Sequence, residues 1–86
     1  MITKLEKMNL YTDLLSELGS RGINYIPEDQ FKMVIIEDTE KTIEVWKDGY
    51  TGGVVSYDYE TNFTDFTNVG CPDFDNVEDA VDWAVN

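Results

Sequence analysis

The sequence predicts a single α+β domain, with an N-terminal helix, a three-stranded antiparallel meander and a C-terminal helix. Three observations favour this class. Apolar residues recur at helical spacing near both ends of the chain, and strand-like alternation occurs between them. The length of 86 residues suffices for one modest hydrophobic core but not for two. Residues 1–86 are therefore expected to form one domain.

The first helix is predicted over about residues 4–18. Thr3 and Glu6 have the spacing of a capping box, which satisfies two otherwise unpaired amides at a helix start. Apolar side chains then recur every three or four positions, at Leu5, Met8, Tyr11, Leu14, Leu15 and Leu18. Gly19 and Gly22 tolerate a positive φ, so the helix is expected to end there.

The central part of the chain is predicted to be extended. The predicted segments are a short extended piece at 23–26, strands at 31–37, 42–47 and 54–60, a tight turn at 38–41 and a glycine-rich connection at 48–53. In the second strand, Glu44 and Trp46 alternate with Ile43 and Val45, so the two pairs are expected on opposite faces of the sheet.

After the third strand, residues 61–72 are predicted to form a polar loop held to the core by Phe63, Phe66 and Val69. Asp75, with Glu78 three residues later, has the spacing of a helix cap. Val77, Ala80, Val81 and Ala84 then mark one face of a helix that is predicted to end near residue 85.

The charge of the chain is its most informative functional feature. The formal net charge is −12, and no lysine, arginine or histidine occurs from residue 48 to residue 86. The same stretch carries nine carboxylates: Asp48, Asp58, Glu60, Asp65, Asp73, Asp75, Glu78, Asp79 and Asp82. Because like charges on a small domain repel and cost stability, this concentration suggests a use, and the simplest use is to attract a basic partner. The alternative is a solvated surface that only keeps the protein soluble.

Several classes of site are not expected. A single cysteine, Cys71, allows no internal disulfide, and with no histidine the common zinc and haem sites are excluded. The stretch 73–79 lacks the ligand order of an EF-hand, and no Lys-Ser or Lys-Thr follows the glycines at 49–53 as a phosphate loop requires. We therefore expect no metal, no cofactor and no enzymatic activity.

The same composition bears on location and on partners. The chain shows neither a signal-peptide pattern nor an 18-residue apolar run, so a cytoplasmic protein without membrane contact is expected. Its negative charge should repel nucleic acids, so direct binding to DNA or RNA is not expected. Uncovered strand edges of a small sheet make self-association into a homodimer a further expectation.

The spacing of the carboxylates allows them to imitate phosphates. Residues i and i+2 on one face of a strand lie about 6.5–7 Å apart, close to the separation of successive phosphates along a DNA strand. Asp58 and Glu60 have this spacing. The residues predicted to contact a basic partner are Glu44, Asp48, Asp58, Glu60, Asp65, Asp73, Asp75, Asp79 and Asp82, with Trp46 as an aromatic anchor.

In size, charge, element order and its cation-free stretch, the chain resembles the small phage-encoded DNA-mimic inhibitors. These include anti-CRISPR proteins, restriction inhibitors, uracil-glycosylase inhibitors and inhibitors of bacterial nucleoid proteins. The resemblance implies a non-catalytic protein that works in the host bacterial cytoplasm and blocks the DNA-binding surface of a host factor, such as the nucleoid protein HU, a Cas or restriction nuclease, or a polymerase. The sequence leaves open the alternative of an acidic immunity or antitoxin protein that neutralises a nuclease toxin.

Overall fold

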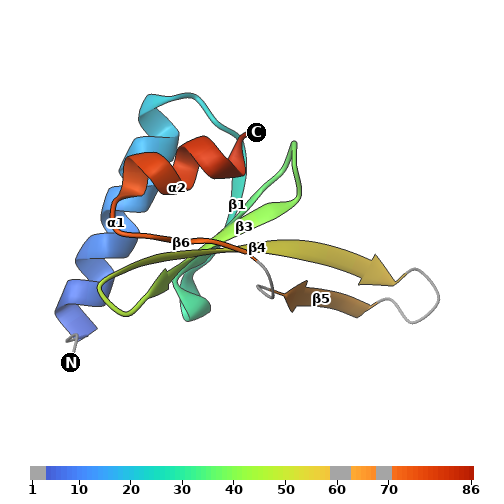
Figure 1. Ribbon diagram of the computed structural model, residues 1–86, viewed down its shortest axis with the longest axis horizontal. Coiled ribbons are helices and arrows are strands. Elements are labelled where there is room, and N and C mark those ends of the chain that lie inside the picture. The colour runs from blue at the N-terminus through green and yellow to red at the C-terminus, as the bar shows by residue number, and fades with distance from the viewer. Residues whose placement is uncertain (1–3, 59–62, 68–70) are drawn as a thin grey trace.

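The computed structural model describes residues 4–58, 63–67 and 71–86, with the backbone alone for residues 56–58 and 63–67. Helix α1 (Lys4–Ser20) comes first and helix α2 (Val77–Ala84) comes last (Figure 1). Between them lie the 3₁₀ turn η1 (Asp29–Phe31) and strands β1 (Tyr25–Glu28), β2 (Met33–Ile36), β3 (Lys41–Trp46), β4 (Gly49–Asp58), β5 (Phe63–Thr67) and β6 (Asp73–Phe74). The predicted α+β class, with a helix at each end of an antiparallel sheet, is confirmed.

The sheet has more strands than predicted. Strands β1 to β5 lie side by side in chain order, each antiparallel to the next, and β6 pairs with the first half of β4 through Tyr50↔Phe74 and Thr51↔Asp73. The predicted meander corresponds to β2, β3 and β4. The number of three strands was wrong because β1, β5 and β6 are short, and short strands carry little periodic signal.

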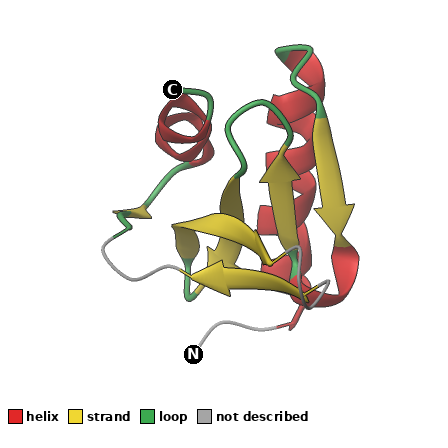
Figure 2. Cartoon of the chain, turned by 90° about the vertical axis from the view of Figure 1, so that its right-hand side faces the viewer, coloured by secondary structure: helices red, strands yellow, loops and turns green. Residues whose placement is uncertain are grey.

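Both helices pack on one face of the sheet (Figures 1 and 2). The strand register pairs Val34 with Ile43 and Val45 with Tyr50, so these four side chains share that face. Against them α1 buries Tyr11, Leu14 and Leu18, and α2 buries Ala80, Val81 and Ala84. The apolar spacing therefore marks the core in α2 and in α1 from Tyr11 onward, as expected for amphipathic helices. The predicted apolar positions Leu5 and Met8, in the first turns of α1, are exposed instead.

Helix α1 ends two residues later than predicted, at Ser20. Gly22 has a φ of 68°, its amide donates to the carbonyl of Gly19, and the amide of Ile23 donates to the carbonyl of Leu18. This pair of bonds is the Schellman arrangement, in which a left-handed residue satisfies the last helical carbonyls. Gly22 therefore ends the helix. The predicted cap at Thr3 lies outside the described residues.

The predicted glycine-rich connection at 48–53 is wrong, because most of it belongs to β4. The turn between β3 and β4 contains only Lys47 and Asp48, and Trp46 already pairs with Gly49. Glycine is usually unfavourable in a strand, but here close neighbours require it. A Cβ atom on Gly49 would clash with the carbonyl oxygen of Phe74. Tertiary packing thus overrides local propensity.

The predicted loop at 61–72 is also wrong in part. Residues 63–67 form β5, which pairs with β4 from Val54↔Thr67 to Asp58↔Phe63. The rest of that segment that the structure describes is Cys71 and Pro72, and the carbonyl of Pro72 accepts a hydrogen bond from the amide of Gly52. The predicted strand at 54–60 is confirmed as far as Asp58.

Lys47 stores backbone strain that a substitution should relieve. Its φ of 54° is left-handed, a conformation that costs most L residues about 1 kcal/mol but that asparagine adopts more readily. Lys47→Asn is therefore expected to raise the free energy of unfolding by about 0.5–1 kcal/mol. Urea unfolding measures this change. Lys47→Gln removes the same charge without relieving the strain, so an equal gain in that variant would contradict the strain explanation.

Candidate functional site

The carboxylates predicted for the site occupy several elements. Asp48 lies in the β3–β4 turn, Asp73 in β6, Asp75 just after it, and Asp79 and Asp82 in α2, and all five are exposed. Asp58 and Asp65 lie in β4 and β5, where only the backbone is described. Glu60 lies outside the described residues, so the i, i+2 spacing predicted for Asp58 and Glu60 stays a prediction.

Packing of Gly49 brings Asp48 and Asp75 together. An ideal Cβ built on Gly49 would lie 3.4 Å from the Cα atom of Asp75. The pairing of Tyr50 with Phe74 continues this contact into the sheet. Because Asp48 and Asp73 flank these positions in the chain, the β3–β4 turn and the segment from β6 to α2 present three carboxylates in one neighbourhood.

The Tyr50 hydroxyl joins this neighbourhood to the two helices. It donates a 2.7 Å hydrogen bond to the carbonyl of Leu10 in α1. Burial, together with the smaller effects of the charges of Asp13 on α1 and Glu78 on α2, raises the pKa of Tyr50 to about 12. The charges of both carboxylates therefore act on this hydroxyl. Asp13 was missed from the sequence, where it is one polar residue on the exposed side of a helix.

We call the set formed by Asp13, Asp48, Asp73, Asp75, Glu78 and Asp79 the acidic band. All six residues are exposed. Within the described residues, none of them forms an ion pair with a lysine or arginine, whereas Arg21 is paired with other carboxylates. Glu78 and Asp79 lie in the first turn of α2, where the helix dipole favours negative charge.

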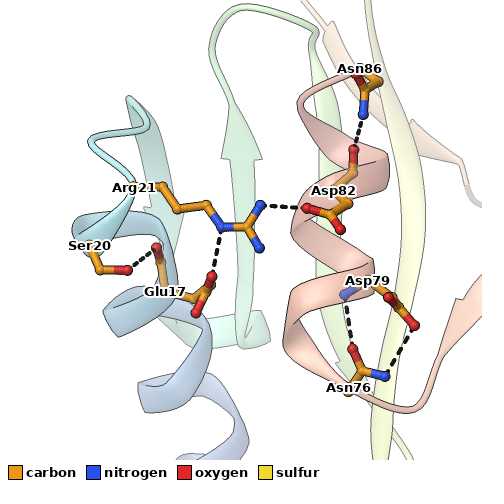
Figure 3. Close-up of polar contacts among 7 residues, drawn as sticks. All are labelled: Glu17, Ser20, Arg21, Asn76, Asp79, Asp82 and Asn86. Carbon is orange, nitrogen blue, oxygen red and sulfur yellow. Dashed lines mark hydrogen bonds and ion pairs between the residues drawn. The ribbon is translucent and has the colours of Figure 1, made fainter.

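Asp82 has a structural partner instead. The Arg21 guanidinium contacts a Glu17 carboxylate oxygen through Nε and an Asp82 carboxylate oxygen through Nη1, each at 2.6 Å (Figure 3). These carboxylates raise the pKa of Arg21, with Asp82 the larger cause. The bridge connects the end of α1 to α2. Because its charge is already compensated, Asp82 is a weaker partner-binding candidate than the sequence suggested.

The spacing of Asp75 and Glu78 predicts that Asp75 caps α2. This prediction is wrong, because the N-cap residue is Asn76. The Asn76 side-chain oxygen accepts a 2.9 Å hydrogen bond from the amide of Asp79, and its side-chain nitrogen donates to the Asp79 carboxylate at 3.1 Å (Figure 3). Asparagine is as good an N-cap as aspartate. Asp75 is therefore left exposed and available to a partner.

Glu44 and Trp46 lie on the sheet face away from the helices, as predicted. Glu44 is half-buried, and burial raises the pKa of its carboxyl, while the charge of Lys7 lowers it. This makes Glu44 a weaker anionic contact than the exposed residues. Trp46 keeps 50% of its surface exposed, whereas its neighbour Val45 keeps 5%. An exposed tryptophan two residues before Asp48 suits an interface anchor.

The second tryptophan, Trp83, belongs to the packing of α2. It is half-buried, lies against Phe74 with ring centroids 5.9 Å apart, and covers Gly52, whose Cβ would meet the indole ring at 2.6 Å. The Lys41 ammonium lies 4.8 Å from the ring centroid and donates to the Trp83 carbonyl. The Lys41 ammonium therefore interacts with α2 of the same chain.

Comparison of the chain with protein-family models, with curated proteins and with solved structures finds no match. Among the described residues, no cluster of histidine, cysteine, aspartate or glutamate has the arrangement of a metal site. No described helix has the length and apolar character needed to cross a membrane.

Proposed function

We propose that this protein is a non-enzymatic inhibitor that imitates DNA and occupies the basic DNA-binding surface of a host protein in the bacterial cytoplasm. The observation that supports this function best is the acidic band. Carboxylates from α1, the β3–β4 turn, β6 and α2 gather around Tyr50 and Gly49, although the chain separates Asp13 from Glu78 by most of its length.

Among the residues that the structure describes, no lysine or arginine forms an ion pair with a carboxylate of the band, which favours an external partner. Arg21 is held by Glu17 and Asp82, and Lys41 by the backbone and ring of Trp83. A cationic cleft on another protein would supply the missing counter-charge. Because both surfaces release condensed ions on contact, the affinity should fall steeply as salt concentration rises.

The packing beneath the band also suits this role. The buried ring of Tyr50 is bonded to α1, and Gly49 lies against the backbone at Phe74 and Asp75. Because these contacts already fix the backbone in the free protein, the backbone does not lose further conformational entropy when a partner binds, which lowers the entropic cost of association. An array of carboxylates on a fixed frame can imitate the regular phosphates of a duplex, whereas charges on a disordered tail cannot.

Neutralisation of the band tests the proposal. The test variant is Asp48→Asn/Asp75→Asn/Glu78→Gln. Its matched control is Glu37→Gln/Asp38→Asn/Glu40→Gln, which removes three exposed carboxylates around the β2–β3 turn. A pull-down from bacterial lysate at low and high salt identifies the target, and a mobility-shift assay with that target and duplex DNA measures inhibition.

We expect the unmodified protein and the control to release DNA from the target stoichiometrically. The band variant should bind about 10- to 100-fold more weakly, because three charge pairs are lost. Equal inhibition by the two triple variants would show that the position of the carboxylates is irrelevant and would refute the mimicry.

A second candidate function is an immunity or antitoxin protein, and the exposure of Trp46 favours it. Such an interface depends on a buried aromatic anchor as much as on charge. In that case Trp46→Ala should weaken binding to a nuclease toxin by more than tenfold even at high salt, since a tryptophan hot spot contributes about 2 kcal/mol or more. A loss confined to the band variant would exclude this alternative.

A further inference from the structure

The second half of β4 and all of β5 form a two-stranded hairpin that projects from the body of the domain (Figure 1). The register between β3 and β4 ends at Lys41↔Val54, followed by one bond from the amide of Val55 to the carbonyl of Glu40. On the other side, β6 reaches only Tyr50 and Thr51. Beyond Val55, within the described residues, β4 is therefore paired with β5 alone. Figure 2 shows this hairpin pointing toward the viewer, in front of the other strands.

Among the described residues, no strand pairs with the outer backbone groups of this hairpin. An isolated two-stranded ribbon is at best marginally stable in water, so this hairpin depends on the part of β4 that lies in the larger sheet. In the described part of the chain, β5 pairs with β4 only, so its outer amides and carbonyls face no other strand. As far as residues 4–58, 63–67 and 71–86 show, its outer edge is open to another strand.

The two edges of the sheet are protected differently. At the opposite edge, β1 has four residues and contains Pro27, which has no amide to donate. Short length and proline are the usual means of preventing edge pairing. The sequence of β5, Phe-Thr-Asp-Phe-Thr, contains no proline, lysine or glycine and is rich in residues that favour strands. Only Asp65 brings a charge to this edge.

We propose that two copies of the chain associate by pairing β5 with β5 in antiparallel orientation. A second copy fits because rotation about a two-fold axis perpendicular to the sheet places its β5 antiparallel to β5 of the first copy. Directly opposite residues of an antiparallel pair have their side chains on the same face of the sheet, whereas neighbouring residues of one strand do not. In a symmetric pair, one residue must therefore lie opposite its own copy, and the two-fold axis passes between these two residues. An axis at Asp65 pairs all five residues, as Phe63↔Thr67, Thr64↔Phe66 and Asp65↔Asp65.

Charge gives this dimer a distinctive signature. Each copy carries a net charge of −12, and the proposed register places two Asp65 residues directly opposite each other. Both effects oppose pairing, so screening by salt should strengthen the dimer. This sign is opposite to that expected for binding of a basic target. The inference is therefore independent of the proposed function, and the two can fail separately.

The experiment is sedimentation equilibrium of the full chain over a wide concentration range at low and high salt. We expect a monomer–dimer equilibrium whose association constant rises with salt. Asp65→Asn should tighten the homodimer by about two- to fivefold, because like charges directly opposite each other destabilise a strand pair by a similar factor.

A mixing experiment then tests the register. Asp65→Lys places a cation opposite Asp65 of the unmodified chain, so a fluorescently labelled mixture should form heterodimers about three- to tenfold more readily than either homodimer. The matched control is Asn9→Lys/Ser16→Lys on the exposed side of α1, which changes the net charge by the same amount. Circular dichroism checks that each variant is folded.

Three results would overturn the proposal. The first is a monomer at every concentration and salt with no heterodimer preference. The second is a dimer that salt weakens, since this would indicate contact between acidic and basic surfaces. The third is equal mixing of the unmodified chain with Asp65→Lys and with the α1 control, which would show that net charge alone, and not pairing at β5, governs association.

Discussion

Gly52→Ala is expected to lower the free energy of unfolding by about 1–3 kcal/mol, since a methyl group has no room in this part of the core. A Cβ at this position would lie 2.6 Å and 2.7 Å from two carbons of the Trp83 ring. The ring is also held by Phe74 and Lys41. It can therefore yield only if α2 shifts away from the sheet. Urea unfolding followed by tryptophan fluorescence measures the loss.

The same substitution at Gly19 provides the control. Gly19 lies in α1 with open space around its Cα atom, so alanine there should stabilise the protein by about 0.5–1 kcal/mol through helix propensity. The two glycine-to-alanine changes are thus expected to have opposite signs. A Gly52→Ala variant as stable as the unmodified protein would contradict the close packing of Trp83 on β4.

These glycines also show why part of the fold could not be predicted from sequence. The helices and β3 were predicted because periodic apolar residues report directly on a buried face. The start of β4 was read as a loop because its glycines at 49, 52 and 53 have low strand propensity. What places them in a strand is the approach of Phe74 and Trp83, residues more than twenty positions away. The amino-acid sequence alone does not indicate these contacts between distant residues.

The candidate site was predictable to a similar degree. Charge counting identified Asp48, Asp73, Asp75 and Asp79, which are all exposed. It could not show that Asp13 and Glu78 both act on Tyr50, because only the packing of α1 and α2 around the sheet brings their charges to the same tyrosine. Nor could it show that Asp82 is compensated by Arg21, a residue 61 positions earlier. The positions of the acidic residues could therefore be predicted from the sequence, whereas the ion pairs between distant residues could not.

Alkaline pH is expected to destabilise the protein through Tyr50. Its pKa is raised from 10.0 to about 12 in the folded state, first by burial and then by Asp13 and Glu78. A raised pKa means that the unfolded chain loses this proton earlier as pH rises. The stabilisation is therefore fully present below pH 10 and is lost between pH 10 and about 12.

The size of this loss follows from the shift. A shift of this extent corresponds to about 2.7 kcal/mol in a fully buried group. Because the Tyr50 hydroxyl is only partly buried, solvent screens part of the effect, and we expect about 1–2 kcal/mol. Tyr11 adds to it in the same direction. Its pKa is raised by burial and by the hydrogen bond that its hydroxyl donates to Asp29 at 2.6 Å.

Urea unfolding at a series of pH values from 8 to 12 measures the slope. Tyr50→Phe should cost about 1 kcal/mol at neutral pH, because the hydrogen bond to the Leu10 carbonyl is lost. It should also remove most of the alkaline loss, since phenylalanine has no proton to release. Tyr11→Phe/Tyr50→Phe should flatten the profile further. If the Tyr50→Phe variant keeps the full slope, the pKa of Tyr50 is not raised in the folded protein, and this explanation of the alkaline loss is wrong.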